Sequence, residues 1–320
     1  MNQVIVSVIL LVYNHEKYLR ESIESILSQK VDFNYEIVIA DDMSTDSSQE
    51  IINYYFRKHA DLIRPVLRSE NIGASKNYYE ACVSAKGKYI ASLEGDDYWC
   101  DDYKLQKMVD FLEGNNSYIG VSHVIEGLDI HGNTERHPVI KDALAAEISI
   151  KELLRGKRFS IIATVYRNIY KDKNYSAIFT AHRQVADYII AVILLDLGKI
   201  WIINEVMSVY RVRNMPGESN YNSITDFMTK AQDHISLICN IARYYDKYNF
   251  TGELVRYSLP AFFSSIRRNL LSDYFDRVFR LLPGKVKIQF FLCLPYYVLK
   301  TLMCSIQGSE KRNKTKKDSL

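Results

Sequence analysis

The stretch on which the fold depends reads Gly87-Lys88-Tyr89-Ile90-Ala91-Ser92-Leu93-Glu94-Gly95-Asp96-Asp97-Tyr98-Trp99. The apolar run Tyr89–Leu93 lies between two glycines, which predicts a short buried strand. Three carboxylates follow it, at the end of a strand where α/β sheets bind their ligands. Such clustered oxygens suit Mg²⁺ or Mn²⁺ with a phosphate as co-ligand, although a solvated acidic turn would give the same pattern. A helix begins near Asp102, and its apolar face is formed by Leu105, Met108, Val109 and Leu112.

Three earlier segments repeat this order of a buried strand followed by an amphipathic helix. Their predicted strands are Val4–Val12, Glu36–Ala40 and Ile63–Leu67. Alternating strands and helices predict right-handed crossovers and a mostly parallel sheet with flanking helices, which is an α/β fold. Polar clusters end three of the four strands, at Tyr13-Asn14, at Asp41-Asp42 and at Glu94–Asp97. Because parallel strands end at a common edge, we expect these clusters to converge.

The second half of the chain is less regular. We expect strands over residues 118–125, 160–166, 200–203 and 206–212, and an apolar helix over 185–197. Ser149 and Glu152 predict a capping box for a short helix, and from about Tyr221 the pattern is helical. The sequence therefore predicts an α/β domain over residues 1–220, a helical region over 221–305 and a basic, disordered tail over 306–320.

Charge and cysteine usage limit the class of protein. The net charge of +3 equals that of residues 310–320, so the other 309 residues sum to zero. Such a body offers no basic face for nucleic acid. The five cysteines are scattered without a C-x-x-C pair, which indicates free thiols in a reducing compartment. The N-terminus has the pattern of a first strand rather than of a signal peptide, and we find no long uncharged apolar run, so we expect a cytoplasmic protein.

The C-terminal end combines two kinds of side chain. Residues 288–303 are apolar and aromatic, and a basic run follows them. Residues 285–320 could therefore lie on an anionic membrane surface, which would place the protein at the inner face of the cytoplasmic membrane. The alternative is a last helix packed on the body, followed by a disordered tail.

Taken in order, the motifs resemble those of the family 2 glycosyltransferases, which have the GT-A fold. The resemblance covers roughly residues 4–215 and rests on Ser7–Ile9 with Tyr13-Asn14, Ile37–Asp46, Asn71–Gly73 with Lys76-Asn77, Leu93–Trp99 with Lys104–Gln106, Asp187, Gly198–Ile200 and Val209–Arg211. It implies an inverting enzyme that moves a sugar from a nucleotide-diphosphate donor, most simply a UDP-sugar, to an acceptor hydroxyl. The implied acceptor is a saccharide or lipid-linked oligosaccharide in bacterial surface polysaccharide synthesis.

The same resemblance implies which residues bind the donor. Tyr13 and Asp42 would hold the nucleotide base, and Lys76 and Arg211 would reach the diphosphate. Three of these residues also have a simpler interpretation. Asp42 could cap a helix, Lys76 could form a surface ion pair, and Arg211 could lie on a solvated strand edge.

The resemblance also implies a metal site and a catalytic base. The D-x-D motif of the family corresponds to Glu94-Gly95-Asp96, with Asp97 adjacent, and it would hold Mg²⁺ or Mn²⁺. Glu94 stands where the family has aspartate, and which of Asp96 and Asp97 binds the metal directly stays open. Asp187 matches the base that deprotonates the acceptor hydroxyl, and its apolar neighbours would raise its pKa. A carboxylate at this position could instead favour the positive end of the helix dipole.

Two other classes compete with this interpretation. A nucleotidyltransferase that makes sugar nucleotides would favour a glycine-rich loop after the first strand, and the segment Tyr13–Lys17 lacks glycine. An inactive sugar-nucleotide-binding protein would not need the carboxylates at positions 94, 96, 97 and 187.

Overall fold

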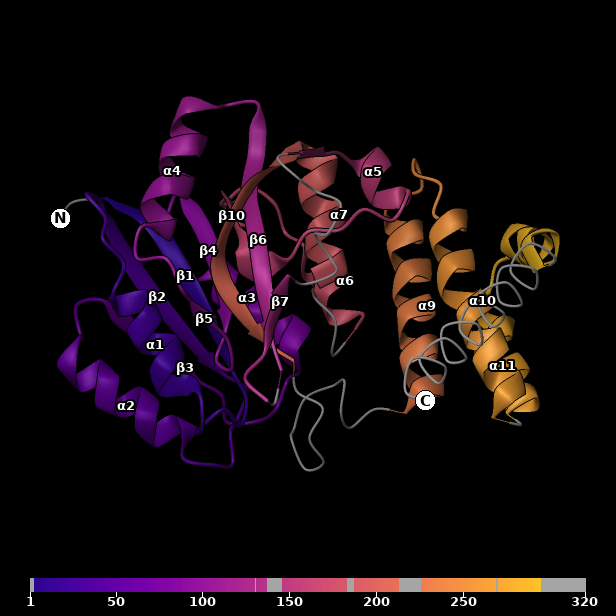
Figure 1. Ribbon diagram of the computed structural model, residues 1–320, viewed down its shortest axis with the longest axis horizontal. Coiled ribbons are helices and arrows are strands. Elements are labelled where there is room, and N and C mark those ends of the chain that lie inside the picture. Colours follow the sequence, from indigo (N-terminus) through magenta and orange to yellow (C-terminus); the bar gives the residue numbers. More distant parts are fainter. Residues whose placement is uncertain are drawn as a thin grey trace, which may run out of the picture. The chain divides into compact units, whose positions relative to one another are not determined.

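The computed structural model describes residues 3–129, 131–136, 146–182, 187–212, 226–268 and 270–294. The chain divides after Ile224 into two compact units, which are treated separately below (Figure 1). The predicted domain boundary at residue 220 and the tail over 306–320 lie outside the described residues.

The first unit is built on a ten-stranded sheet whose main path runs β3-β2-β1-β4-β9-β6-β10-β5, with β7 paired to β6 and β8 to β10. The first four strands of this path are parallel, as the alternation of strands and helices predicted, and so are β6 and β10. The strands are β1 Val4–Val12, β2 Asn34–Asp41, β3 Ile63–Leu67, β4 Tyr89–Glu94, β5 Tyr98–Trp99, β6 Tyr118–Leu128, β7 Thr134–Arg136, β8 Glu147–Ile148, β9 Thr164–Arg167 and β10 Lys199–Arg211.

Helices flank this sheet (Figure 1). They are α1 Leu19–Leu27, α2 Ser48–Lys58, α3 Ala74–Val83, α4 Lys104–Gly114, α5 Ile150–Leu154, α6 Ser176–Thr180 and α7 Asp187–Leu197. Side chains point to alternate faces of a strand, so β1 contributes Val8 and Leu10 to a core that also contains Leu19 of α1 and Leu105 of α4. The intervening β1 residues face the side on which α3 packs. The mixed α/β fold and the helical C-terminal region are both confirmed.

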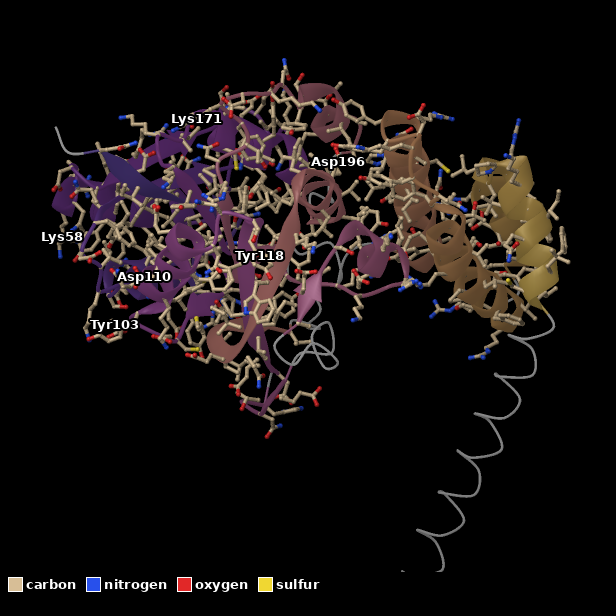
Figure 2. The ribbon with its side chains drawn as sticks, turned by 90° about the horizontal axis from the view of Figure 1, so that it is seen from above. Lys58, Tyr103, Asp110, Tyr118, Lys171 and Asp196 are labelled. Carbon is tan, nitrogen blue, oxygen red and sulfur yellow. The ribbon has the colours of Figure 1, made fainter. Side chains whose placement is uncertain are left out.

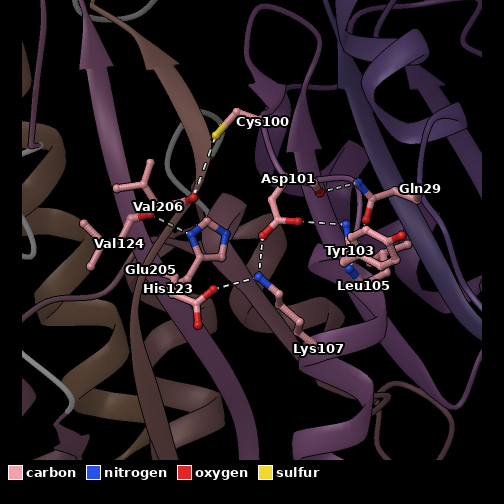
Figure 3. A network of polar contacts seen from close by, with 10 residues as sticks. All are labelled: Gln29, Cys100, Asp101, Tyr103, Leu105, Lys107, His123, Val124, Glu205 and Val206. Carbon is pink, nitrogen blue, oxygen red and sulfur yellow. Dashed lines mark hydrogen bonds and ion pairs between the residues drawn. The ribbon is translucent and has the colours of Figure 1, made fainter.

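Two local predictions were wrong. The segments 200–203 and 206–212 form one strand, β10, because its ladder with β6 continues through a register shift between Ile203 and Val206. Polar residues at this irregularity resembled a turn, but Glu205 accepts a hydrogen bond of 2.7 Å from Lys107, which also donates to Asp101 (Figure 3). Residues 160–166 begin as the 3₁₀ turn η2, Ile161–Ala163, and become extended only at β9.

Among the residues that the structure describes, two basic side chains lie wholly inside the first unit. Lys104 is fully buried, with Nζ 4.1 Å from the ring centroid of Trp99 and 3.3 Å from the carbonyl oxygen of Ile162. Burial lowers the pKa of Lys104 well below its ordinary value. His123 is also buried, with Nδ1 2.7 Å from the carbonyl oxygen of Val124 (Figure 3), and burial lowers its pKa too.

Other charged side chains of this unit follow the usual pattern. Lys58, Asp110 and Lys171 lie on the outside of the first unit (Figure 2). Placing charges in water avoids the cost of desolvating them, which makes Lys104 an exception that needs a local reason.

The second unit is helical, as predicted. It contains α9 Phe227–Tyr244, α10 Thr251–Arg267, α11 Leu271–Arg277 and the 3₁₀ turn η3 Phe279–Leu281, followed by helical residues 284–294. Asp226 caps α9 by accepting backbone hydrogen bonds from residues 228 and 229. Aromatic rings pack in its core, with Phe262 5.4 Å from Tyr274 and 5.5 Å from Phe290 between centroids. Within the described parts of the chain, we find no helix with both the length and the apolar character to cross a bilayer.

Candidate functional site

The polar ends of β1, β2 and β4 meet at one edge of the sheet. These three strands are neighbours, and their register pairs Val12 of β1 with Asp41 of β2 and Leu11 of β1 with Glu94 of β4. The convergence expected from the strand order is therefore confirmed.

The loops after β1 and β2 are held in an unusual backbone conformation. Asn14 and Met43 have φ angles of 58° and 64°, in the left-handed region that side chains other than glycine rarely adopt. Reciprocal hydrogen bonds join the two loops, because the Thr45 N–H donates to Asn14 Oδ1 at 2.8 Å and the Asn14 N–H donates to Ser44 Oγ at 2.9 Å. Backbone strain that is stabilised in this way is typical of ligand-binding loops.

Asp42 fixes the turn that precedes α3. Its Oδ1 accepts the Ile72 N–H at 2.8 Å, and its Oδ2 accepts the Gly73 N–H at 2.9 Å. Gly73 has a φ of 89°, which a residue with a side chain would adopt only under strain. The α2 helix has Ser47 at its N-cap, so Asp42 does not cap that helix. The predicted contact of Asp42 with the nucleotide base stays a prediction.

Tyr13 and Lys76 lie at the surface. The Tyr13 side chain is exposed at the end of β1. Lys76 Nζ is 3.8 Å from a carboxylate oxygen of Glu80, one turn along α3, in a half-exposed ion pair. The ion pair matches the simpler interpretation of Lys76 without testing whether the side chain also reaches a diphosphate.

Arg211 is the last residue of β10, and its guanidinium group contacts two aromatic rings, a backbone carbonyl and a carboxylate. Its guanidinium lies 4.8 Å from the ring centroids of both Tyr18 and Tyr98, donates to the carbonyl oxygen of Asp96 and pairs with Glu21. The side chain is largely buried, so it does not lie on a solvated strand edge. These contacts tie α1, β5 and β10 to the acidic turn, and the predicted contact of Arg211 with a diphosphate stays a prediction.

The acidic turn brings three carboxylates together. Ligand oxygens of Glu94, Asp96 and Asp97 all lie within 4.8 Å of one another. Asp97 is fully buried, and its Oδ1 accepts the Arg211 backbone N–H at 2.8 Å. Burial, together with the charges of Asp96 and Glu94, raises the pKa of Asp97 well above its ordinary value, while Arg211 opposes this effect. The cluster thus carries more negative charge than its surroundings compensate.

One oxygen of this cluster tests whether a metal would fit. Asp97 Oδ2 is buried and has no hydrogen-bond partner among the residues that the structure describes. A buried carboxylate oxygen without a donor is costly, and a divalent cation would satisfy it. The donor set consists of hard oxygens only, which is the set that Mg²⁺ and Mn²⁺ prefer. Glu94, Asp96 and Asp97 therefore fit the predicted metal.

Gly95 lets the acidic turn fold tightly against its neighbours. Its N–H donates to the Leu11 carbonyl oxygen at 2.8 Å. A Cβ at this position would lie 2.7 Å from His15 Nδ1 and 3.2 Å from the same carbonyl oxygen. His15 in turn places Nε2 4.0 Å from Asp96 Oδ1. Glycine is therefore required by the close approach of β1 to the turn.

A pocket of about 50 Å³ separates the acidic turn from Asp187. Glu94 lines one part of it, and Asp187, the first residue of α7, lines another. Asp187 is exposed, but the surrounding protein desolvates its carboxyl group and raises its pKa, as predicted. Its neighbours at 183–186 lie outside the described residues. The structure thus brings Glu94 and Asp187, which are distant in sequence, to one pocket.

Several contacts of the site could not be found from the sequence. Tyr18 directly precedes α1 and Glu21 lies on it, in a sequence pattern typical of an ordinary amphipathic helix, yet both contact Arg211. Ser22 of the same helix donates to the backbone carbonyl of Asp97. His15 could have been found from its position directly after Tyr13-Asn14.

The strand order, the acidic turn at the end of β4 and the carboxylate at the head of α7 are features of the GT-A fold. The chain belongs to glycosyl transferase family 2, whose model matches residues 7–183. Its relatives include Rv1520 of Mycobacterium tuberculosis, 32% identical over 207 residues, which cover 64% of this chain and 58% of that protein. This chain therefore spans less than two thirds of that relative.

Two further comparisons connect the chain with proteins whose names are more informative. The putative teichuronic acid biosynthesis glycosyltransferase TuaG of Bacillus subtilis is 37% identical over 108 residues, which cover 34% of this chain and 42% of TuaG. The structure of S. aureus TarS 1-349 in complex with UDP-GlcNAc superimposes with a TM-score of 0.60 at 20% identity, covering 88% of this chain and 82% of TarS 1-349. At that identity the likeness supports the fold alone.

Proposed function

We propose that this chain is an inverting glycosyltransferase that moves a sugar from a UDP-sugar to an acceptor hydroxyl in bacterial cell-surface polysaccharide synthesis. The observation that carries the proposal is the pocket with the acidic turn on one side and Asp187 on the other. The name of TuaG supports the polysaccharide pathway, and the acceptor would be a saccharide or lipid-linked oligosaccharide.

The nucleotide half of the donor would occupy the loops after β1 and β2. The exposed Tyr13 ring offers a face for the base, and Asp42, held by two backbone N–H groups, offers an acceptor for a ring N–H. Lys76 and Arg211 are the candidate cations for the diphosphate. Glu94, Asp96 and Asp97 would hold Mg²⁺ or Mn²⁺, which when bound offsets the charge that develops on the leaving diphosphate.

Asp187 would act as the general base. Its carboxylate takes the proton of the acceptor hydroxyl as that oxygen forms a bond to the anomeric carbon of the donor sugar. The bond between the anomeric carbon and the diphosphate breaks, and UDP leaves with the electron pair. Attack from the face opposite the leaving group inverts the configuration. The raised pKa of Asp187 makes it a stronger base than an ordinary aspartate.

Release of UDP from a UDP-sugar in the presence of Mn²⁺ tests the proposal without a known acceptor. We expect Asp96→Ala to abolish the release, while Asp110→Ala, an exposed carboxylate on α4, leaves it unchanged. Formation of a sugar nucleotide from a sugar phosphate and UTP would instead identify a nucleotidyltransferase. A wild-type protein that binds UDP-sugars without releasing UDP, even with candidate acceptors present, would be an inactive binding protein.

We also place the protein at an anionic membrane surface through its second unit. Residues 225–320 hold 16 lysines and arginines against 8 aspartates and glutamates, a net charge of +8, whereas residues 1–224 hold 25 against 30, a net charge of −5. The balance over the first 309 residues thus conceals two opposite charges. In the helical segment 284–294, Ile288, Phe291 and Leu292 are exposed beside Lys285 and Lys287. Exposed apolar side chains next to cations suit an anionic lipid surface.

Vesicle flotation tests this location. We expect the full chain to float with phosphatidylglycerol vesicles, and the triple variant Ile288→Ser, Phe291→Ser, Leu292→Ser to float less. A matched triple change to serine at exposed apolar residues of the first unit, Met43, Val83 and Leu197, should float like the wild type. Equal flotation of the two triple variants would contradict a membrane role for residues 284–294.

A further inference from the structure

A chain of buried hydroxyl groups runs through the first unit and ends at the pocket. Tyr170 Oη lies 3.3 Å from Tyr166 Oη, which lies 2.5 Å from Tyr78 Oη, which lies 2.9 Å from Ser92 Oγ. All four residues are buried, and they come from α3, β4, β9 and the segment after β9. Tyr78 and Ser92 line the pocket, so the chain ends beside the acidic turn.

The chain of hydroxyl groups can present a hydrogen-bond donor to the pocket. Burial raises the pKa of Tyr78, Tyr166 and Tyr170 well above the ordinary value, so all three hydroxyl groups stay protonated at neutral pH. Each can donate to the next group while it accepts from the one before. When the protons run from Tyr170 toward Ser92, the Ser92 hydroxyl can donate into the pocket, and successive hydrogen bonds of this kind strengthen one another.

The other walls of the pocket limit the group that it can take. Ala74 of α3, Ile161 and Ile162 of η2 and Ile190 of α7 present apolar surface. The described residues that line the pocket include two carboxylates and no lysine, arginine or histidine. At about 50 Å³, the pocket suits one small substituent rather than a second sugar ring.

We propose that this pocket selects donors whose sugar carries an acetamido group, an inference that rests on the glycosyltransferase function proposed above. The Ser92 hydroxyl would donate to the acetamido carbonyl oxygen, and the wall formed by Ala74, Ile161 and Ile162 would take the methyl group. A simple hydroxyl in the same place would leave the apolar wall uncovered. A uronate would place its charged carboxylate against the wall formed by Ala74, Ile161 and Ile162, whose side chains offer neither a hydrogen-bond donor nor a positive charge.

Donor selectivity tests this inference. The rate of UDP release and the calorimetric affinity are measured for UDP-N-acetylglucosamine, UDP-glucose and UDP-glucuronate, each with Mn²⁺. We expect kcat/KM for the acetamido donor to exceed that for UDP-glucose by about tenfold, the combined effect of one neutral hydrogen bond and a buried methyl group. UDP-glucuronate should bind most weakly of the three.

Two variants distinguish the contribution of the Ser92 hydroxyl group to donor selectivity from that of the apolar wall. Ser92→Ala should lower the ratio of acetamido to glucose kcat/KM by about fivefold, since it removes the donor but little volume. Ala74→Leu should lower the ratio by filling the pocket. The matched controls Ser84→Ala, on the exposed end of α3, and Ala60→Leu, in an exposed turn, should keep the wild-type ratio.

The results distinguish a failure of the proposed transferase function from a failure of the acetamido pocket. If no UDP-sugar binds or releases UDP, the proposed function fails, and the donor preference fails with it. If UDP-sugars react but the acetamido donor has no advantage, or both pocket variants keep the wild-type ratio, the acetamido pocket is wrong while the transferase function stands. A preference for UDP-glucuronate would overturn the chemistry assigned to the pocket.

Discussion

Replacing Gly95 by alanine should damage the metal site by crowding rather than by removing a ligand. The new Cβ would lie 2.7 Å from His15 Nδ1 and 3.2 Å from the Leu11 carbonyl oxygen. The imidazole can turn away, but the carbonyl oxygen belongs to β1 and cannot move without disturbing the sheet. Because His15 Nε2 is 4.0 Å from Asp96 Oδ1, a shift of the ring reaches the metal carboxylates directly.

The expected magnitude follows from these contacts. Adding atoms to a well-packed site typically costs ~1–3 kcal/mol. For a unit of this size, that corresponds to a fall in Tm of roughly 2–4 °C per kcal/mol. A displacement of a few tenths of an ångström at Asp96 should also weaken Mn²⁺ binding by about tenfold, because metal sites depend on the orientation of each ligand.

Gly114→Ala gives the matched control. It places the same methyl group at the end of α4, where nothing lies within 4 Å of the added Cβ, and it should be neutral or slightly stabilising. Urea unfolding gives the stability of both variants, and calorimetry gives the Mn²⁺ affinity. The reasoning is refuted if Gly95→Ala matches Gly114→Ala in both measurements.

Three further predictions concern Asp187, Lys104 and Arg211. The surrounding protein desolvates the Asp187 carboxyl group and raises its pKa, so the kcat of the wild type should fall as the pH drops through that raised pKa. Asp187→Asn should lower kcat by about 100-fold and remove this limb of the pH–rate profile, and an unchanged profile would contradict its role as base. Unfolding returns Lys104 to a pKa near 10.5, so the unfolded state binds a proton that the folded state lacks, and stability should rise with pH between the lowered pKa and 10.5. Lys104→Met should remove this slope in urea titrations at successive pH values, and equal slopes in both proteins would show that the buried amine stays charged. Arg211→Met should lower the free energy of unfolding in urea by ~2–4 kcal/mol, because the variant loses the hydrogen bond to the Asp96 carbonyl and two ring contacts. Glu21→Gln changes only a half-exposed ion pair and should lower it by less than ~1 kcal/mol. Equal losses in the two variants would mean that the ion pair dominates.

The parts of the fold that were predictable are those that depend on local pattern. The apolar runs of β1, β2, β3 and β4 fixed the parallel core, because a buried parallel strand needs continuous hydrophobic residues and leaves its polar residues for the ends. The same logic placed the carboxylates of residues 94, 96 and 97 at a common edge with Asp42. The strand pairing then followed from the order of elements.

The parts that were not predictable depend on contacts between distant segments. β10 continues through its irregularity because β6 supplies the ladder, and no local pattern in β10 shows this. The protein neighbours of Arg211, which are Tyr18, Glu21 and Tyr98, are brought to it by tertiary packing, which the sequence does not show. The protein has 24 tyrosines, and three of them form the hydroxyl chain of Tyr78, Tyr166 and Tyr170, which no local pattern shows either.

The linked loops after β1 and β2 should affect how fast the nucleotide product is released. Asn14 and Met43 are already held in left-handed backbone conformations, and hydrogen bonds such as that from Thr45 to Asn14 connect the loops before any nucleotide arrives. A nucleotide that binds to preformed loops orders little additional chain, so more of the contact energy is kept as affinity. Under the proposed function, UDP would use these loops as fully as its sugar conjugate does. The spent nucleotide should therefore be a strong competitive inhibitor, and its departure rather than bond formation should limit turnover.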